Sequence, residues 1–146
     1  MTMKVRSITI ADPEYQVVYR LRNELLRLPL GLSLDDEDLS DDAKDTIWIA
    51  EENRKIEGCV MMHPIDDNTI KLRQMAVHKA AQGTGVGREL VAAAEQGALQ
   101  QGYKKIVLHA RITAIGFYEK MHYQVTSDTF TEVGIPHQKM EKILHP

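Results

Sequence analysis

Several features that mark special classes of protein are scarce in this sequence. It holds one cysteine, Cys59, which excludes a disulfide within the chain, and the apolar residues around it predict a buried thiol. No apolar run approaches the roughly 20 residues that are needed to cross a bilayer. Positive charge is not in excess, because 18 lysines and arginines face 21 acidic residues and give a net charge of −3. That balance argues against a general nucleic-acid-binding protein, whose surface is basic.

The amino-terminal residues also lack the apolar core of a signal peptide, since Lys4, Arg6 and Asp12 interrupt it. We therefore expect a cytoplasmic protein with no membrane partner. The chain has 146 residues, of which 43% are hydrophobic and 27% charged, as in an ordinary soluble domain with its own core. We expect a single domain over residues 1–146.

The hydrophobic pattern predicts an irregular succession of strands and helices. Helical spacing predicts helices over residues 13–27, 86–101 and 113–121, and Asp12-Pro13-Glu14 predicts Asp12 as the N-cap of the first. Strands are expected over residues 5–9, 46–50, 56–63, 69–77, 105–109, 123–126 and 135–143. The order β-α-β-β-β-α-β-α-β-β predicts an α+β fold with one mixed sheet rather than a doubly wound sheet.

An acidic stretch precedes the second strand, with Asp35-Asp36-Glu37-Asp38 followed by Asp41-Asp42. We expect it to form a solvated loop or a short helix. A metal site would need ligands that converge, and nothing in the spacing enforces convergence, so no metal is expected.

The most informative stretch is the glycine-rich turn that joins residues 69–77 to the long helix. It reads Gln82-Gly83-Thr84-Gly85-Val86-Gly87, with Arg88 next. Glycines leave the backbone N–H groups open to a ligand, and the first N–H groups of a helix attract anions. The turn therefore predicts a phosphate-binding site. It is neither a P-loop, which needs Lys-Ser/Thr after its last glycine, nor a dinucleotide fingerprint, because Arg88 stands at the third glycine position.

Two motifs carry a resemblance to a known family. The glycine-rich turn fits Q/R-x-x-G-x-G/A and resembles the pyrophosphate loop of the GNAT superfamily of N-acetyltransferases. The segment from Ala114 to Tyr123 is similar to that family's A-x-x-F-Y-x-K-x-G-F segment, with His122 in place of the usual glycine. The glycine commonly has a positive φ, which histidine adopts at some cost. The resemblance implies a GNAT-like fold, with a mostly antiparallel sheet that has helices on both faces.

The resemblance also implies acetyl-CoA as co-substrate and a set of binding residues. It implies that Tyr118 is the general acid for the leaving thiolate, and that the N–H group of Met75 polarises the acetyl carbonyl. The main chain of Met75 and Val77 is expected to pair with the pantetheine arm. The implied coenzyme-binding residues are Met75, Ala76, Val77, Gln82, Gly83, Thr84, Gly85, Val86, Gly87 and Arg88.

A narrower resemblance concerns the acceptor. The segments Leu21-Arg22, Leu72 to Ala76, Ala110-Arg111 and Gly134 to His137 are similar to the glyphosate N-acetyltransferase subgroup. That likeness implies His137 as the base and an anionic amine bound by Arg22, Arg73 and Arg111. The residue types agree, because histidine accepts a proton near neutral pH and arginine binds carboxylate or phosphate.

Other interpretations remain open at this point. His109 is a second candidate for the base. A protein or peptide N-acetyltransferase would bind basic peptides, to which the acidic stretch is suited. A sensor that binds acyl-CoA without turnover would need neither Tyr118 nor His137. Small members of the family often pair, which makes a second copy of the chain a candidate partner.

Overall fold

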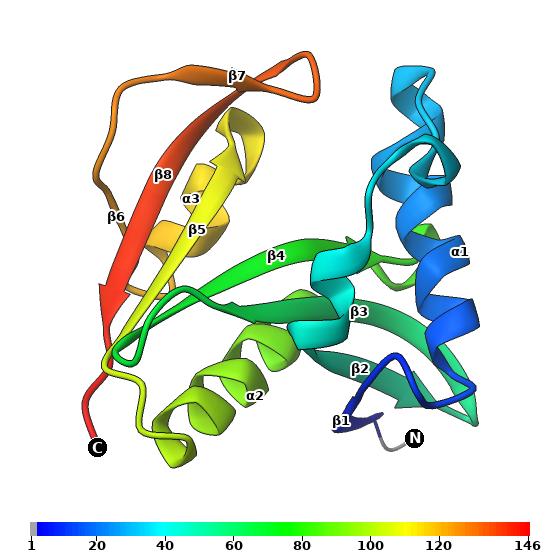
Figure 1. The fold of residues 1–146 in the computed structure, drawn as a ribbon, viewed down its shortest axis with the longest axis horizontal. Helices are drawn as coiled ribbons and strands as arrows, with labels where there is room; N and C mark the ends of the chain where they lie inside the picture. The colour runs from blue at the N-terminus through cyan, green and yellow to red at the C-terminus, as the bar shows by residue number, and fades with distance from the viewer. Residues whose placement is uncertain (1–2) are drawn as a thin grey trace.

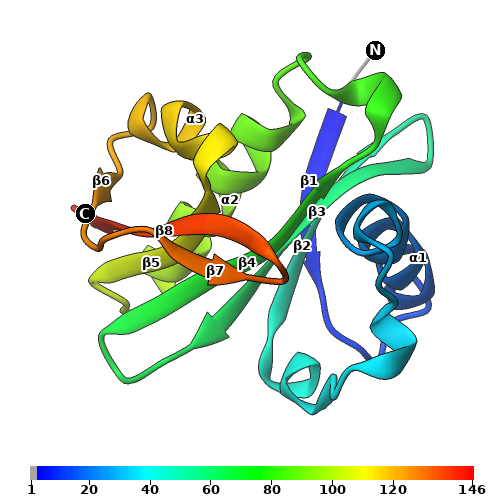
Figure 2. The ribbon, with the colours of Figure 1, turned by 90° about the horizontal axis from the view of Figure 1, so that it is seen from above.

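The computed structural model describes residues 3–146, which form one eight-stranded sheet with helices on both of its faces (Figure 1, Figure 2). The strands are β1 (Met3–Ile8), β2 (Thr46–Glu52), β3 (Lys55–Pro64), β4 (Thr69–Val77), β5 (Lys105–Arg111), β6 (Gln124–Val125), β7 (Phe130–Glu132) and β8 (Ile135–Ile143). The α-helices are α1 (Tyr15–Leu26), α2 (Val86–Gln100) and α3 (Ile115–Glu119). Short 3₁₀ helices occupy Leu28–Leu30, Leu34–Asp36, Ser40–Lys44, Lys79–Ala81 and Ile112–Ala114.

The sheet has the order β1-β2-β3-β4-β5-β8-β6, with β7 also paired to β8. Every pair is antiparallel except β4 and β5, which run parallel on either side of the α2 crossover. The predicted α+β class and mixed, mostly antiparallel sheet are therefore confirmed. The sequence pattern does not predict β7, which lies in the polar segment between β6 and β8. It pairs with β8 through a two-residue turn in which Val133 and Gly134 both have positive φ.

Two details of the predicted elements are corrected. Asp12 is not the N-cap of α1, because its carboxylate accepts a hydrogen bond from the N–H group of Thr9 (2.8 Å) and the helix begins at Tyr15. The acidic stretch forms 3₁₀ helices, but it is not solvated throughout, since the side chain of Asp42 is buried.

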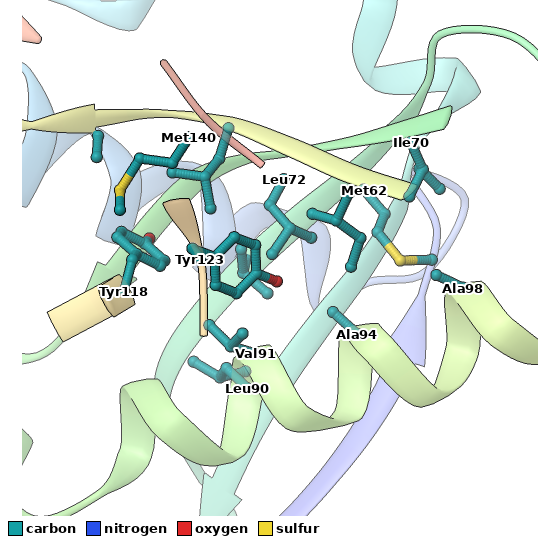
Figure 3. Packing of buried hydrophobic residues seen from close by; sticks show 14 of the residues in the cluster. Met62, Ile70, Leu72, Leu90, Val91, Ala94, Ala98, Tyr118, Tyr123 and Met140 are labelled. Atoms are coloured by element: carbon teal, nitrogen blue, oxygen red, sulfur yellow. The ribbon is translucent and has the colours of Figure 1, made fainter. Parts of the chain in front are cut away.

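Helices cover both faces of the sheet (Figure 2), and each face buries its own hydrophobic cluster. α1 packs Val18 and Leu21 against apolar residues of β2 and β3. On the other face, α2 and α3 cover the larger cluster, where Ala94 and Ala98 of α2 face Met62 of β3 (Figure 3). Apolar residues at helical spacing thus fix both helices on the sheet.

The position of the functional site follows from how β4 and β5 separate. Their register runs only from Thr69↔Lys105 to Leu72↔Leu108, and beyond that point the strands run apart (Figure 1). β4 also contains a bulge. The register with β3 moves from Met61↔Arg73 to Cys59↔Ala76, so β4 carries one extra residue there.

Candidate active site

A cleft of about 570 Å³ lies where β4 and β5 separate. Its walls come from the second half of β4, the end of β5, the start of α3 and the β7–β8 hairpin, while the end of α1 closes one side. The cleft brings together many of the predicted site residues from distant parts of the chain, namely Arg73, Met75, Ala76, Val77, Gln82, His109, Arg111, Tyr118 and His137. Arg22 and the residues from Gly83 to Arg88 do not line it.

The glycine-rich turn continues from the β4 end of the cleft and leads into α2. Gly83 (φ +79°) and Gly85 (φ +92°) have left-handed backbones, and a Cβ added at either would meet no atom within 4 Å. Among residues 3–146, the N–H groups of Gly83 and Gly85 donate no hydrogen bond outside regular elements. The side chain of Gln82 fastens the turn to β4 by donating to the carbonyl oxygen of Val77 (3.0 Å). Open space, free donors and the start of a 15-residue helix fit a pyrophosphate group.

The bulge in β4 is held by contacts from α1 and β3. Its residue Gln74 has φ +58°, an unusual backbone for a residue other than glycine. The Gln74 side chain accepts a hydrogen bond from Nε of Arg22 (3.1 Å), and its carbonyl oxygen accepts one from the thiol of Cys59 (3.7 Å). Both contacts fix the backbone that presents Met75 to the cleft.

Tyr118 lies in α3 with its ring almost buried against Phe117 and Tyr123. Burial raises the pKa of its phenol to about 12. The phenol is therefore protonated at neutral pH and can donate a proton or a hydrogen bond into the cleft. The neighbouring His122 has φ +74°, which confirms the backbone expected from the glycine that it replaces.

The two candidate bases lie on one side of the cleft. His137 of β8 pairs with Arg111 of β5, and His109 lies two residues before Arg111 on the same face. β7 places two further side chains beside them. Phe130 stacks on the ring of His137 (centroids 6.0 Å apart, 25° between planes), and Glu132 contacts both histidines.

Glu132 and Lys71 are cleft residues that the sequence motifs do not single out. Glu132 lies in a segment without hydrophobic periodicity, which gives no sign of β7. Lys71 lies in β4, two residues before Arg73. Strand alternation places both side chains on the same face, so the sequence could have indicated Lys71 as a cleft residue. Burial chiefly lowers the pKa of Lys71, and Glu132 acts in the opposite direction.

The three predicted arginines have different environments. Arg22 is 0% exposed and does not line the cleft, and its Nη1 binds Asp42 (2.7 Å). Arg73 lines the cleft but binds Asp42 (2.7 Å) and Asp45 (2.8 Å). Arg111 lines the cleft and forms no hydrogen bond or ion pair within the described part of the chain. Burial, followed by the charge of Arg27, lowers its pKa.

Neither a metal-binding cluster nor a membrane-spanning helix is present within residues 3–146. No group of three or more His, Cys, Asp or Glu side chains is arranged to hold a metal ion there. No helix in that range combines the length and the apolar character that a membrane crossing requires.

Comparison with known proteins gives consistent matches. The model of the acetyltransferase (GNAT) domain matches residues 34–144. A crystal structure of a Lactobacillus plantarum protein assigned as an N-acetyltransferase is 28% identical, with 99% of this chain and 100% of that chain covered and a TM-score of 0.87. Escherichia coli ElaA shares the fold at 16% identity, with 97% and 99% of the chains covered and a TM-score of 0.83.

Among curated sequences, Bacillus subtilis YyaT is 36% identical over 75 residues, which are 51% of each chain. Human N-acetyltransferase 8B is 31% identical over 94 residues, covering 59% of this chain and 41% of the human protein. The chain therefore matches about half of the length of these curated relatives.

Proposed function

This chain belongs to the GNAT family of acetyltransferases, and from that premise we propose that it transfers the acetyl group of acetyl-CoA to the amine of a small anionic metabolite. Acetyl-CoA supplies an activated acetyl thioester. The chain must bind the coenzyme, stabilise the charge that develops on the carbonyl oxygen, protonate the departing thiolate and remove a proton from the acceptor amine.

The coenzyme end relies on the backbone. N–H groups of Gly83, Gly85, Val86, Gly87 and Arg88 would hold the pyrophosphate, because they lie in the open turn and the first turn of α2. Val86 also points its side chain into the core, which anchors the start of the helix.

The pantetheine arm would lie beside the free half of β4. Backbone groups of Met75 and Val77 can pair with it, as β4 has no parallel partner beyond Leu72. The N–H group of Met75, set by the bulge at Gln74, would polarise the acetyl carbonyl.

The proton transfers are assigned to two side chains. His137 takes the proton from the acceptor nitrogen, whose electron pair forms the new bond to the acetyl carbon. Tyr118 gives a proton to the departing sulfur, because burial keeps its phenol protonated. His109 remains the alternative base.

The observation that carries the acceptor proposal is the free guanidinium of Arg111. It lines the cleft opposite His137 in the β5–β8 register and has no partner of its own among the described residues. A guanidinium in that position favours a carboxylate or phosphonate on the acceptor. Arg22 and Arg73 already bind aspartates, so we assign them to holding β4 in place rather than to direct binding of the acceptor.

The test is acetyl-CoA turnover, measured as free thiol, against acidic amino acids, aminophosphonates, polyamines and basic peptides. We expect anionic amines to react. Arg111→Ala should raise their KM about 10-fold or more, since a charge-assisted hydrogen bond contributes about 1.5–3 kcal/mol. Arg20→Ala, an exposed arginine on α1, is the matched control and should leave KM unchanged.

Three outcomes would count against the proposal. Reaction only with basic peptides or polyamines would favour a protein or peptide N-acetyltransferase. An unchanged KM in Arg111→Ala would remove the anion site. Tight coenzyme binding without turnover on any amine would favour a sensor of acyl-CoA.

A further inference from the structure

The short strand β7 places one carboxylate between the two cleft histidines. Glu132 Oε1 lies 2.9 Å from Nδ1 of His109, and Oε2 lies 3.8 Å from Nε2 of His137. Each oxygen of Glu132 thus faces a different ring. Phe130, two residues earlier, contacts the same two rings, edge-on to His109 and stacked on His137.

Hydrogen bonding determines which nitrogen of His137 carries the proton in the neutral ring. Nδ1 lies 3.0 Å from the carbonyl oxygen of Ile135, which can only accept, so Nδ1 bears the hydrogen. Nε2 then holds the lone pair, and it is the nitrogen that faces Glu132. The same reasoning gives His109 a hydrogen on Nδ1, because the carboxylate of Glu132 accepts there.

Other charges also face this group. Lys71 of β4 lies 3.5 Å from Nδ1 of His109, and Arg111 of β5 pairs with His137 in register. Lys139 of β8 is directed to Glu141 (3.7 Å). Burial raises the pKa of Glu132, but the hydrogen bond and charge of His109, followed by the charges of Lys71 and His137, outweigh burial and lower it overall. Glu132 is therefore ionised at neutral pH.

We infer that Glu132 is a positioning residue for the base: one oxygen orients His109, and the other stabilises the charge that His137 acquires when it takes the proton of the acceptor. This inference rests on the proposed function. The proton leaves the acceptor nitrogen and forms a bond to Nε2 of His137, while Glu132 stays ionised throughout. The 3.8 Å separation is too long for a hydrogen bond in the resting ring, so the carboxylate acts there through its charge.

The experiment compares the whole protein with Glu132→Gln, which keeps the shape and an acceptor for His109 but removes the charge. The titration of each histidine ring is followed by NMR, with the signals assigned from His137→Gln and His109→Gln. We expect the His137 ring to lose its proton at a lower pH in Glu132→Gln than in the wild type, because the negative charge 3.8 Å from Nε2 is removed. Solvent screens part of this effect, since the Glu132 side chain is 43% exposed.

Kinetics provide the second readout. The acidic limb of the pH profile of kcat/KM should move to lower pH by the same amount, and its plateau should fall about 3- to 10-fold because the base is weaker. If Glu132→Gln only disturbed the structure, kcat/KM would fall at every pH and the acidic limb would stay at the same pH.

Glu37→Gln is the matched control for the NMR titration, since it removes one negative charge from the same cleft at Arg27, away from both histidines. It should leave the His137 midpoint unchanged. An equal midpoint in wild type and Glu132→Gln, or an equal shift in Glu37→Gln, would overturn the inference. The titration needs no acceptor, so absence of turnover would refute the proposed function while leaving this measurement intact.

Discussion

Asp42 is the side chain whose replacement should most disturb the buried ion pairs that hold Arg22 and Arg73. It is 2% exposed and accepts hydrogen bonds from Tyr15 (2.6 Å), Arg22 (2.7 Å) and Arg73 (2.7 Å). Asp42→Asn keeps the volume of the side chain but removes its charge and turns one acceptor into a donor. Arg22 would then be a buried cation without a counter-ion, and its Nη2 already has no hydrogen-bond partner among residues 3–146.

Removing one member of a buried ion pair costs about 3–5 kcal/mol. The lower end applies here, because Arg73 is partly exposed and keeps Asp45 as a partner (2.8 Å). We therefore expect Asp42→Asn to lower the free energy of unfolding by about 3 kcal/mol, a large share of the roughly 5–15 kcal/mol of a typical domain. With a urea m-value of about 1–3 kcal/mol/M, the midpoint of urea denaturation should fall by about 1 M or more.

The loss of stability in Asp42→Asn should also depend on pH. Burial raises the pKa of Asp42, but the hydrogen bonds of Tyr15, Arg22 and Arg73 outweigh it and lower the pKa overall. A carboxyl with a lowered pKa contributes stability above its unfolded pKa of about 3.9, and this contribution is lost as the pH falls through the folded value. The difference between wild type and Asp42→Asn should therefore narrow below about pH 4.

The neighbouring Asp41 provides the control because it is exposed, and Asp41→Asn should change the free energy of unfolding by less than about 0.5 kcal/mol. A loss below about 1 kcal/mol in Asp42→Asn would refute the argument from buried charge. A loss that stays constant down to pH 3 would refute the argument from ionisation.

Three further predictions concern single residues. Tyr118→Phe should lower kcat about 100-fold or more by steady-state kinetics, with coenzyme A binding unchanged by calorimetry; unchanged kcat would remove Tyr118 as the acid. Gly85→Ala should weaken acetyl-CoA binding about 10-fold, because a φ of +92° strains alanine in the turn. Gly31→Ala is the control: its φ is +74° but it lies outside the cleft, so acetyl-CoA binding should not change. Gly97→Ala should cost about 1–3 kcal/mol in chemical denaturation, because its Cβ would lie 2.9 Å from Cη2 of the Trp48 indole; equal stability would show that the ring can move aside.

Regular hydrophobic patterns predicted most of the fold. β4 and β8 match their expected residues, and α2 begins at Val86 as expected, because each is long enough for its apolar residues to mark it in the sequence. β7 lacks such a period, since it is three residues long and depends on its turn and on pairing with β8. Short strands of this kind are set by tertiary contacts that local sequence does not reveal.

In the candidate site, too, local features could be predicted from sequence, whereas features that depend on tertiary contacts could not. The glycine-rich turn could be read from sequence because its function depends on backbone conformation, which glycine reveals directly. The three arginines could not be told apart, because residue type alone does not say which one finds a carboxylate in the folded chain. Arg73 meets Asp42 from 31 residues away along the chain, whereas Arg111 meets none within residues 3–146. Nor does residue type show that Arg22 is fully buried and does not line the cleft.

The two ends of the cleft are built differently, and this has a consequence for specificity. The proposed coenzyme end would use backbone groups of β4, the glycine-rich turn and α2, which change little when side chains are replaced. The proposed acceptor end would use side chains of β5 and of the β7–β8 hairpin, where Arg111, Glu132 and His137 line the cleft. Within residues 3–146 the hairpin pairs with β5 and β6 but not with β4, so its side chains can be exchanged without disturbing the β4 bulge. Selection for a new acceptor should therefore alter this hairpin first and leave the coenzyme end unchanged.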